Sequence, residues 1–308
     1  MSGLGLALDE YLAVRRALGF KMDTQAGQLA GFVAFADQAD VVTITTEVAL
    51  AWAMLPPGAS PGWQARRLHM VCGFARHLHG LDPRTEVPPA DLLTGRNYRP
   101  TPYLYSADEV DRLRAAAREL SPPLRAATLD TLIGLLSVTG LRIGEAIRLD
   151  RDDIDPTGRT LLVHDPKRGA SRLLPLHPST IDALGTYSRL RDRLCPQPSA
   201  PSMFVSTRGS RLAHTTIYTA FGEVLRHVGL EPPAVARRPR VHDFRHAFAV
   251  NTLVNWYRDG GDIGARLPLL SGYLGHASPA ATYWYLSAAP ELLRLAAERL
   301  DHPIWDRP

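Results

Sequence analysis

Arginine side chains suited to binding an anion lie in two separate segments of this 308-residue chain. In the first, residues 139–145, Gly140 can end one helix and Arg142 then falls in the first turn of the next. An arginine there opposes the helix dipole at a cost of roughly 0.3–1 kcal/mol, which an anion shared with nearby amides would offset. Pairing of Arg142 with Glu145, three residues later, is the alternative, and these residues alone favour it.

The second segment is residues 241–249, where helical spacing places His242, Arg245 and His246 on one face. The two histidines could form half of a zinc site. However, the glutamate of an HExxH motif is absent and no third ligand is near in sequence. We therefore expect a phosphate site here and no metal. Three arginines directly upstream are candidate contacts to a nucleic-acid backbone: Arg237, Arg238 and Arg240.

Lysine is rare in this chain, since 33 of its 35 basic residues are arginine and only Lys21 and Lys167 are lysine. Lys167 lies between two short β-type runs, residues 160–163 and 172–176, which predict a hairpin with this lysine at its tip. A solvated turn lysine is the ordinary interpretation. Lysine can, however, release its proton when its pKa is lowered, whereas arginine effectively cannot. Lys167 is therefore a candidate general acid.

A histidine and several aromatic residues near the C-terminus form the last candidate cluster. His276 follows Gly275, and Tyr285 lies nine residues further on. Aromatic residues in such a place usually belong to a core or an interface. Residues 279–299 predict a helix, on which Tyr283 and Tyr285 point about 200° apart.

Periodicity and capping residues predict a mainly α-helical protein with a small antiparallel β-sheet. Residues 1–90 predict an N-terminal helical domain, the proline-rich residues 91–105 a linker, and residues 106–308 a second domain that starts at a capping box. Neither βαβ alternation nor a glycine-rich phosphate loop occurs, which argues against a nucleotide-binding α/β fold. The predicted helices cover residues 6–18, 24–39, 46–54, 60–78, 179–194, 214–228, 241–258, 264–274 and 279–299.

The charge distribution permits a nucleic-acid partner. The formal net charge is +4; residues 1–90 hold 7 basic and 8 acidic side chains, and residues 91–308 hold 28 and 23. In the N-terminal domain, Arg66 and Arg67 lie on the fourth predicted helix, as part of either a binding face or an ordinary solvated one.

Composition also bounds the cellular setting. The two cysteines, Cys72 and Cys195, are far apart and form neither a disulfide framework nor a zinc knuckle. No apolar run approaches the roughly 20 residues that span a bilayer, and the first residues lack the pattern of a signal peptide. We therefore expect a cytoplasmic protein with no membrane partner.

One ordered set of residues resembles the active site of the tyrosine recombinases, the family that includes phage integrases and chromosome-dimer resolvases. The resemblance covers about residues 101–300, and residues 1–90 are similar to that family's DNA-binding (core-binding) domain. Residues 269–287 are similar to recombinases carried by mobile elements. The chain departs from the family's pattern at Phe244, where many members have leucine, and at residues 256–265, which look like an extra loop between Arg245 and His276. The residues that carry the resemblance are Arg142, Lys167, His242, Arg245, His276 and Tyr285.

The resemblance implies a site-specific recombinase that cleaves and rejoins DNA through a 3′-phosphotyrosyl intermediate on Tyr285. His242 would accept the tyrosine proton, Lys167 would protonate the departing 5′-oxygen, and the remaining catalytic residues would bind the phosphate. No metal, ATP or other cofactor is implied. The implied partner is double-stranded DNA with a specific recombination site, bound by a homo- or hetero-tetramer on two sites. Residues 290–300 could dock on a neighbouring protomer or pack on their own domain.

Three other functions fit some of these residues. A type IB topoisomerase would use the same chemistry, although the separate N-terminal helices favour a recombinase. A non-catalytic DNA-binding accessory protein could keep the fold, although every expected catalytic side chain is present. A metal hydrolase is the third alternative, and full activity in a chelator would exclude it.

Overall fold

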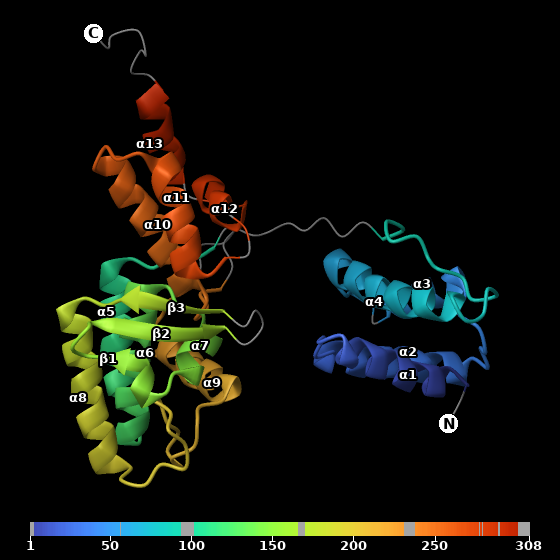
Figure 1. Cartoon of the computed structure of the whole chain (residues 1–308), viewed down its shortest axis with the longest axis horizontal. Helices are drawn as coiled ribbons and strands as arrows, with labels where there is room; N and C mark the ends of the chain where they lie inside the picture. Colours follow the sequence, from blue (N-terminus) through green and yellow to red (C-terminus); the bar gives the residue numbers. More distant parts are fainter. Residues whose placement is uncertain are drawn as a thin grey trace. The chain divides into compact units, whose positions relative to one another are not determined.

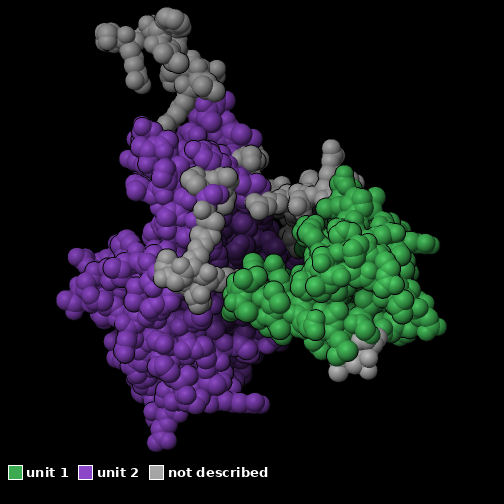
Figure 2. All heavy atoms as spheres, turned by 45° about the vertical axis from the view of Figure 1, so that its right-hand side comes forward, with its two compact units in different colours: residues 1–99 green, residues 100–308 purple. Residues whose placement is uncertain are grey.

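The chain divides into two compact units, residues 1–99 and residues 100–308. Figure 2 distinguishes them by colour. The computed structural model describes residues 3–55, 57–93, 102–165, 170–230, 238–276, 278, 280–288 and 290–300.

The described residues of the first unit form four helices around one apolar core. The helices α1 to α4 span Gly3–Ala17, Asp23–Gln38, Thr46–Met54 and Pro61–His79, which confirms the four helices expected in this region. Side-chain caps set two of their starts: the Thr45 hydroxyl accepts from the Val48 N–H, and the Ser60 hydroxyl accepts from the Trp63 N–H. Phe32 and Phe74, both with 0% exposure, lie in the core between these helices.

The second unit is also mainly helical (Figure 1). Its first helix, α5, begins after the predicted capping box, in which the Ser106 hydroxyl and the Glu109 carboxylate each accept a backbone N–H from the other residue. The next, α6, ends at Gly140, whose φ of 61° is the left-handed conformation that glycine adopts without strain. The helices α5 to α13 span Ala107–Arg118, Pro123–Thr139, Ile143–Arg148, Pro178–Leu194, His214–Val228, Asp243–Arg258, Ile263–Leu274, Ala280–Ala288 and Pro290–Leu300.

A three-stranded antiparallel sheet interrupts the helices. Its strands are β1 (Ile154–Asp155), β2 (Thr160–Asp165) and β3 (Ala170–Pro175), in the order β1-β2-β3. Strands β2 and β3 form the expected hairpin, and the two-residue β1 was not predicted. The observed architecture confirms the predicted fold class. Lys167 falls in residues 166–169, outside the described part of the chain.

Two apolar cores organise the second unit. The larger contains buried side chains of α5–α10, of the sheet and of the segment between α8 and α9, among them Leu132, Phe204 and Phe244. The smaller is formed by α10–α13 and includes Leu253, Leu292 and Tyr285. Helix α13 packs on α10 and α12 of its own unit, where Leu292 is 1% exposed.

Three features differ from the sequence-based expectations. The single helix expected over residues 279–299 is two helices, α12 and α13, and Pro290 begins the second because a proline fits the first turn of a helix but not its interior. The loop expected over residues 256–265 is only residues 259–262, since α10 continues to Arg258 and Asp262 caps α11. At the end of the expected linker, Tyr105 is 3% exposed and its ring stacks on Phe244 in the second unit.

No helix within the described ranges is long and apolar enough to cross a lipid bilayer.

Candidate active site

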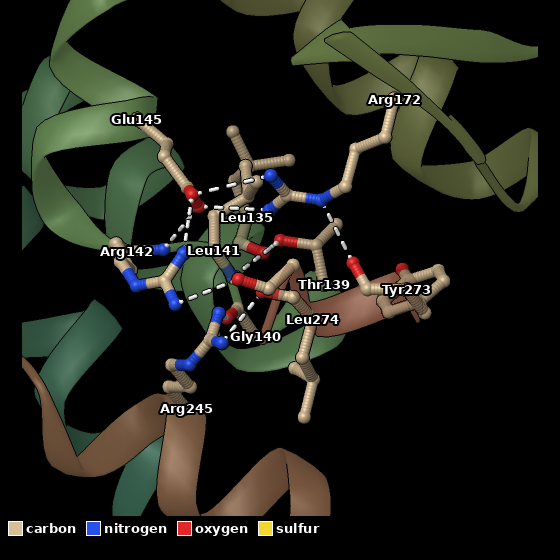
Figure 3. A network of polar contacts seen from close by, with 11 residues as sticks. Leu135, Thr139, Gly140, Leu141, Arg142, Glu145, Arg172, Arg245, Tyr273 and Leu274 are labelled. Atoms are coloured by element: carbon tan, nitrogen blue, oxygen red, sulfur yellow. Dashed lines mark hydrogen bonds and ion pairs between the residues drawn. The ribbon is translucent and has the colours of Figure 1, made fainter. Parts of the chain in front are cut away.

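The turn that ends α11 accepts hydrogen bonds from both candidate phosphate-binding arginines (Figure 3). Arg142 Nη2 donates to the Gly275 carbonyl at 3.0 Å, and Arg245 Nη2 donates to the Leu274 carbonyl at 2.6 Å. Two arginines that are far apart in sequence are therefore fixed on consecutive carbonyl groups, directly before His276.

Arg142 precedes α7 as its N-cap residue, in an extended conformation, and does not lie in the first helical turn as expected. Its Nη1 donates to Glu145 Oε1 at 2.8 Å, so the expected i,i+3 pair forms as well. The Arg142 side chain is 38% exposed, whereas that of Glu145 is 4% exposed. The pairing therefore leaves part of the Arg142 guanidinium accessible to a ligand.

Arg245 lies in the first turn of α10 and is 2% exposed. Its Nη1 donates to the Gly140 carbonyl at 2.9 Å, which ties α10 to the end of α6. Burial, followed by the positive charge of Arg142, lowers the pKa of Arg245 to about 10. The guanidinium still carries its proton at neutral pH, so a concentrated positive charge lies below the turn.

His276 is oriented by a neighbouring hydroxyl. Gly275 adopts a φ of 65°, and the His276 N–H then donates to the Ser271 carbonyl at 3.0 Å. The imidazole Nδ1 lies 2.8 Å from Oγ1 of Thr282, a residue of α12 with 0% exposure. This contact fixes the orientation of the imidazole ring beside the turn.

Tyr285 lies against the histidines of the cluster, whereas Tyr283 points to solvent. The Tyr285 ring stacks with His276 at a centroid distance of 6.0 Å and lies 5.5 Å from the ring of His246. Tyr285 is 3% exposed and Tyr283 is 54% exposed. Of the two tyrosines, therefore, only Tyr285 lies in the candidate site.

His242 immediately precedes α10, and the ring of His246 lies between it and Tyr285. Its ring centroid is 4.8 Å from that of His246, which in turn contacts Tyr285. Burial lowers the pKa of His242 below its ordinary value, and the charges of Arg245 and Arg240 lower it further. The imidazole is therefore neutral at pH 7 and can accept a proton. Sequence reasoning placed His246 on one face with His242 and Arg245 and considered it for a metal pair, but gave it no catalytic role; in the structure its ring contacts those of both His242 and Tyr285.

Arg172 on β3 is a member of the cluster that the sequence did not reveal. Its guanidinium makes a two-pronged contact with Glu145, at 3.2 Å and 3.0 Å, and its Nε donates to the Tyr273 carbonyl at 2.9 Å. Figure 3 shows Arg142 and Arg172 converging on the single carboxylate of Glu145. A hairpin arginine has no sequence signal that identifies so distant a partner.

Two of the candidate DNA-binding arginines flank an open groove in the second unit. Arg238 and Arg240 line it together with Arg226 and His242, and its volume is about 600 Å³. The Arg240 guanidinium also donates to the buried carboxylate of Asp243 at 2.8 Å. Arg237 lies outside the described residues.

The two candidate arginines in the first unit differ in their surroundings. Arg66 is exposed and lies 5.6 Å from the ring of Trp63. Arg67 is half-buried, stacks 3.7 Å from the ring of Trp52 and donates to the Trp52 carbonyl at 2.8 Å. Burial lowers the pKa of Arg67. Arg67 therefore contributes to the packing of α4 on α3, whereas Arg66 is accessible to a ligand.

Among the described residues, no three His, Cys, Asp or Glu side chains come together in a way that could hold a metal ion.

The sequence model of the phage integrase family matches residues 104–291. This stretch contains all the residues of the cluster described above. The chain belongs to the phage integrase family. The resemblance to the tyrosine recombinases drawn from six residues is thus confirmed.

The family's members include close relatives of this chain. An integrase/recombinase of Sinorhizobium fredii, y4rB, is 43% identical over 313 aligned positions that cover 100% of both chains. Tyrosine recombinase XerD of Brucella abortus is 31% identical and covers 82% of this chain and 80% of its own length. The structure of the recombinase XerH, solved with a palindromic difH substrate after cleavage, has the same fold: its TM-score is 0.69 at 19% identity, with 95% of this chain and 82% of that chain covered.

Proposed function

We propose that this family member is a site-specific DNA recombinase that cleaves and rejoins DNA strands through Tyr285. One observation carries the proposal: Tyr285 and His276 are stacked directly beside the turn on which Arg142 and Arg245 converge. A tyrosine, a histidine and two arginines are the groups needed to attack a phosphodiester and to stabilise its transition state.

The proposed reaction is a pair of transesterifications. The Tyr285 oxygen attacks the scissile phosphorus, an O–P bond forms, and the bond from phosphorus to the 5′-oxygen breaks. The phenolic proton passes to His242, and Lys167 donates a proton to the 5′-oxygen. The product is a 3′-phosphotyrosyl bond and a free 5′-hydroxyl. A 5′-hydroxyl from a second strand then attacks the phosphotyrosine, which restores both the tyrosine and a continuous strand.

The arginines and His276 supply the charge that this reaction needs. Negative charge builds up on the non-bridging oxygens during attack, and planar guanidinium groups match those oxygens with two N–H donors each. Because one phosphoester bond replaces another, the bond energy is kept and no ATP is needed. We therefore expect cleavage without an added metal or nucleotide.

The proposed substrate is double-stranded DNA, held by both units. XerH was solved with its difH DNA, and the arginine-lined groove beside His242 offers a surface for phosphates here. We further propose that the helices of the first unit, on which Arg66 is exposed, also contact the DNA, and that four protomers act on two DNA sites.

The experiment that tests this function uses genomic DNA from the source organism, carrying random nicks. Where a nick lies close to a cleavage site, cleavage leaves a short fragment with a 5′-hydroxyl that dissociates from the duplex. Because this fragment is no longer there to rejoin, the covalent intermediate accumulates. Complexes that survive denaturant are captured, their DNA is sequenced, and the attached peptide is identified by mass spectrometry. A phosphotyrosine at Tyr285 and one recurring sequence support the proposal. No covalent DNA, or attachment at another residue, contradicts it. Adducts scattered over all sequences, together with relaxation of any plasmid, indicate a topoisomerase instead.

Replacing Lys167 with arginine should slow strand cleavage by roughly 100-fold or more while DNA affinity stays unchanged. Arginine keeps the positive charge but is far too weak an acid to protonate the 5′-oxygen. The rate is measured in a single turnover on the cleavage site mapped above. A 5′-bridging phosphorothiolate, whose sulfur leaves without a proton, should restore cleavage.

The matched control is Lys21→Arg, which changes the only other lysine of the chain. It should cleave at the wild-type rate. Wild-type cleavage by Lys167→Arg on the ordinary substrate would rule out lysine as the general acid.

Cleavage should slow as the pH is lowered through the depressed pKa of His242. Burial and nearby arginines keep the imidazole neutral down to a pH below its ordinary pKa, so the base is intact at pH 7. Below that pKa the rate should fall about tenfold per pH unit. His242→Gln should be slow throughout and lack this acid limb. An unchanged limb in the glutamine variant would assign the base to another residue.

A further inference from the structure

Arg172 occupies a central place between three parts of the second unit. It lies on β3, where its Cα pairs with that of Val163 on β2, and its side chain is 16% exposed. Its guanidinium reaches Glu145 on α7 and its Nε reaches the Tyr273 carbonyl on α11. The proposed reaction does not involve this side chain.

The turn before His276 is shaped to the Arg172 guanidinium. A Cβ atom at Gly275 would lie 2.8 Å from Arg172 Nη1, closer than a side-chain carbon can approach without displacement. The φ of 65° at Gly275 disfavours other residues there independently. Arg172 therefore packs directly against the turn that precedes His276.

Glu145 is the residue through which Arg172 reaches the site. Its carboxylate is 4% exposed and accepts from the Arg142 N–H at 2.9 Å, from Arg142 Nη1 at 2.8 Å and from both Arg172 Nη groups. Burial on its own would raise the pKa of Glu145, but the hydrogen bonds from Arg172 and the Arg142 backbone outweigh it and the pKa is lowered. The buried carboxylate is therefore ionised at neutral pH.

The charge balance of this cluster depends on Arg172. Arg142, Glu145 and Arg172 together carry a net charge of +1, so the charge of Arg142 remains available beside the phosphate. Without Arg172, a buried carboxylate would face Arg142 alone, and the two would form a neutral pair. In a site of low dielectric constant such a pair binds a phosphate much more weakly than a free guanidinium does.

We propose that Arg172 is a positioning residue that neutralises Glu145 and thereby leaves Arg142 to bind the scissile phosphate. The proposal rests on the proposed function, because it assigns Arg172 a part in the same cleavage step. It differs from a purely structural role, in which Arg172 would only attach the hairpin of Lys167 to α11.

Arg172→Met tests the proposal, because methionine keeps the length and removes the charge. Single-turnover cleavage should fall roughly 10- to 100-fold, while DNA affinity stays close to wild type. Arg172→Lys, which keeps a charge next to Glu145, should recover most of the lost rate. Arg151→Met is the matched control, since it breaks an ion pair with Asp192 in which Arg151 is 48% exposed, and it should cleave normally.

A second substitution separates charge compensation from packing. Glu145→Gln removes the negative charge that Arg172 balances, so in that background Arg172→Met should cost less than about threefold in rate. Thermal unfolding is followed for each variant, and Arg172→Gln, which also removes the charge, replaces Arg172→Met in the cycle if the methionine variant does not fold. An equal loss in both backgrounds would overturn the proposal.

Cleavage of the phosphorothiolate substrate shows whether Arg172→Met impairs Arg142 or Lys167. Because Arg142 acts on the phosphate and not on the leaving group, Arg172→Met should remain slow on this substrate. Full recovery there would show that Arg172 acts through the hairpin and would overturn the proposal. Wild-type cleavage by Arg172→Met overturns this inference alone, whereas failure of the wild-type protein to form an adduct overturns the proposed function too.

Discussion

Replacing Tyr285 with phenylalanine should abolish the covalent protein–DNA adduct while DNA binding persists. The substitution removes one hydroxyl group and keeps the ring, which is 3% exposed and packed against His276, His246 and Trp284. The ring contacts that hold α12 against the site should therefore survive, and the nucleophile alone is lost. We expect no adduct above background on a nicked substrate and wild-type affinity in a gel-shift measurement.

The chain provides a matched control two residues away. Tyr283→Phe removes a hydroxyl from the same helix at a position that is 54% exposed, and it should form the adduct at the wild-type rate. An undiminished adduct in Tyr285→Phe, or a lost adduct in Tyr283→Phe only, would move the nucleophile away from Tyr285.

Replacing Arg245 with lysine should reduce cleavage by roughly 100- to 1,000-fold, the usual cost of losing one preorganised donor. Arg245 donates to two carbonyls, those of Gly140 and Leu274, and its planar group can do so while it faces a phosphate. A lysine ammonium is a compact charge that cannot span the same distance between the two carbonyls. One buried carbonyl would then lose its partner, at a cost of about 1–3 kcal/mol in the free energy of unfolding.

The protonation state adds to this loss. Burial and the neighbouring Arg142 lower the pKa of Arg245 to about 10, at which arginine is still charged at neutral pH. Lysine starts from a lower ordinary pKa, so the same surroundings would bring it towards neutrality. Cleavage by Arg245→Lys should therefore recover in part as the pH is lowered from 8 towards 7.

Arg258→Lys is the control for Arg245→Lys, because it lies at the other end of α10 with a 60% exposed side chain paired to Glu291. It should leave both cleavage and thermal unfolding unchanged. A wild-type rate for Arg245→Lys would show that the fork geometry of this arginine is not needed.

Local sequence signals predicted the helix starts and the hairpin well. Ser60 and Ser106 cap helices as expected because the capping hydroxyl and its N–H partner are three residues apart in sequence. The prediction failed where local signals are ambiguous. Pro290 is compatible both with the end of one helix and with the start of another, and the apolar pattern of residues 279–299 continues across it.

The candidate catalytic residues could be proposed from the sequence, by resemblance to the tyrosine recombinases, but their supporting contacts could not. Order and spacing made Arg245 and Tyr285 candidates, whereas the contact of Arg172 with Glu145 joins residues 27 positions apart and its bond to Tyr273 joins residues 101 positions apart. Such contacts depend on how helices and strands pack in three dimensions. Arg142 shows the same difference between local and distant contacts. Its pairing with Glu145 was correctly favoured from the sequence, but its hydrogen bond to the Gly275 carbonyl, 133 residues away, could not be predicted.

The convergence of three guanidinium groups on residues 273–275 has a consequence for the chain during its synthesis. Arg172, Arg245 and Arg142 find their acceptors on the consecutive carbonyls of Tyr273, Leu274 and Gly275. A nascent chain, or a proteolytic fragment that stops before this turn, has the arginines but not the frame that holds them, and it lacks Tyr285 as well. The proposed cleavage activity therefore depends on the last part of the chain, and a fragment that stops before this turn should form no covalent adduct with DNA.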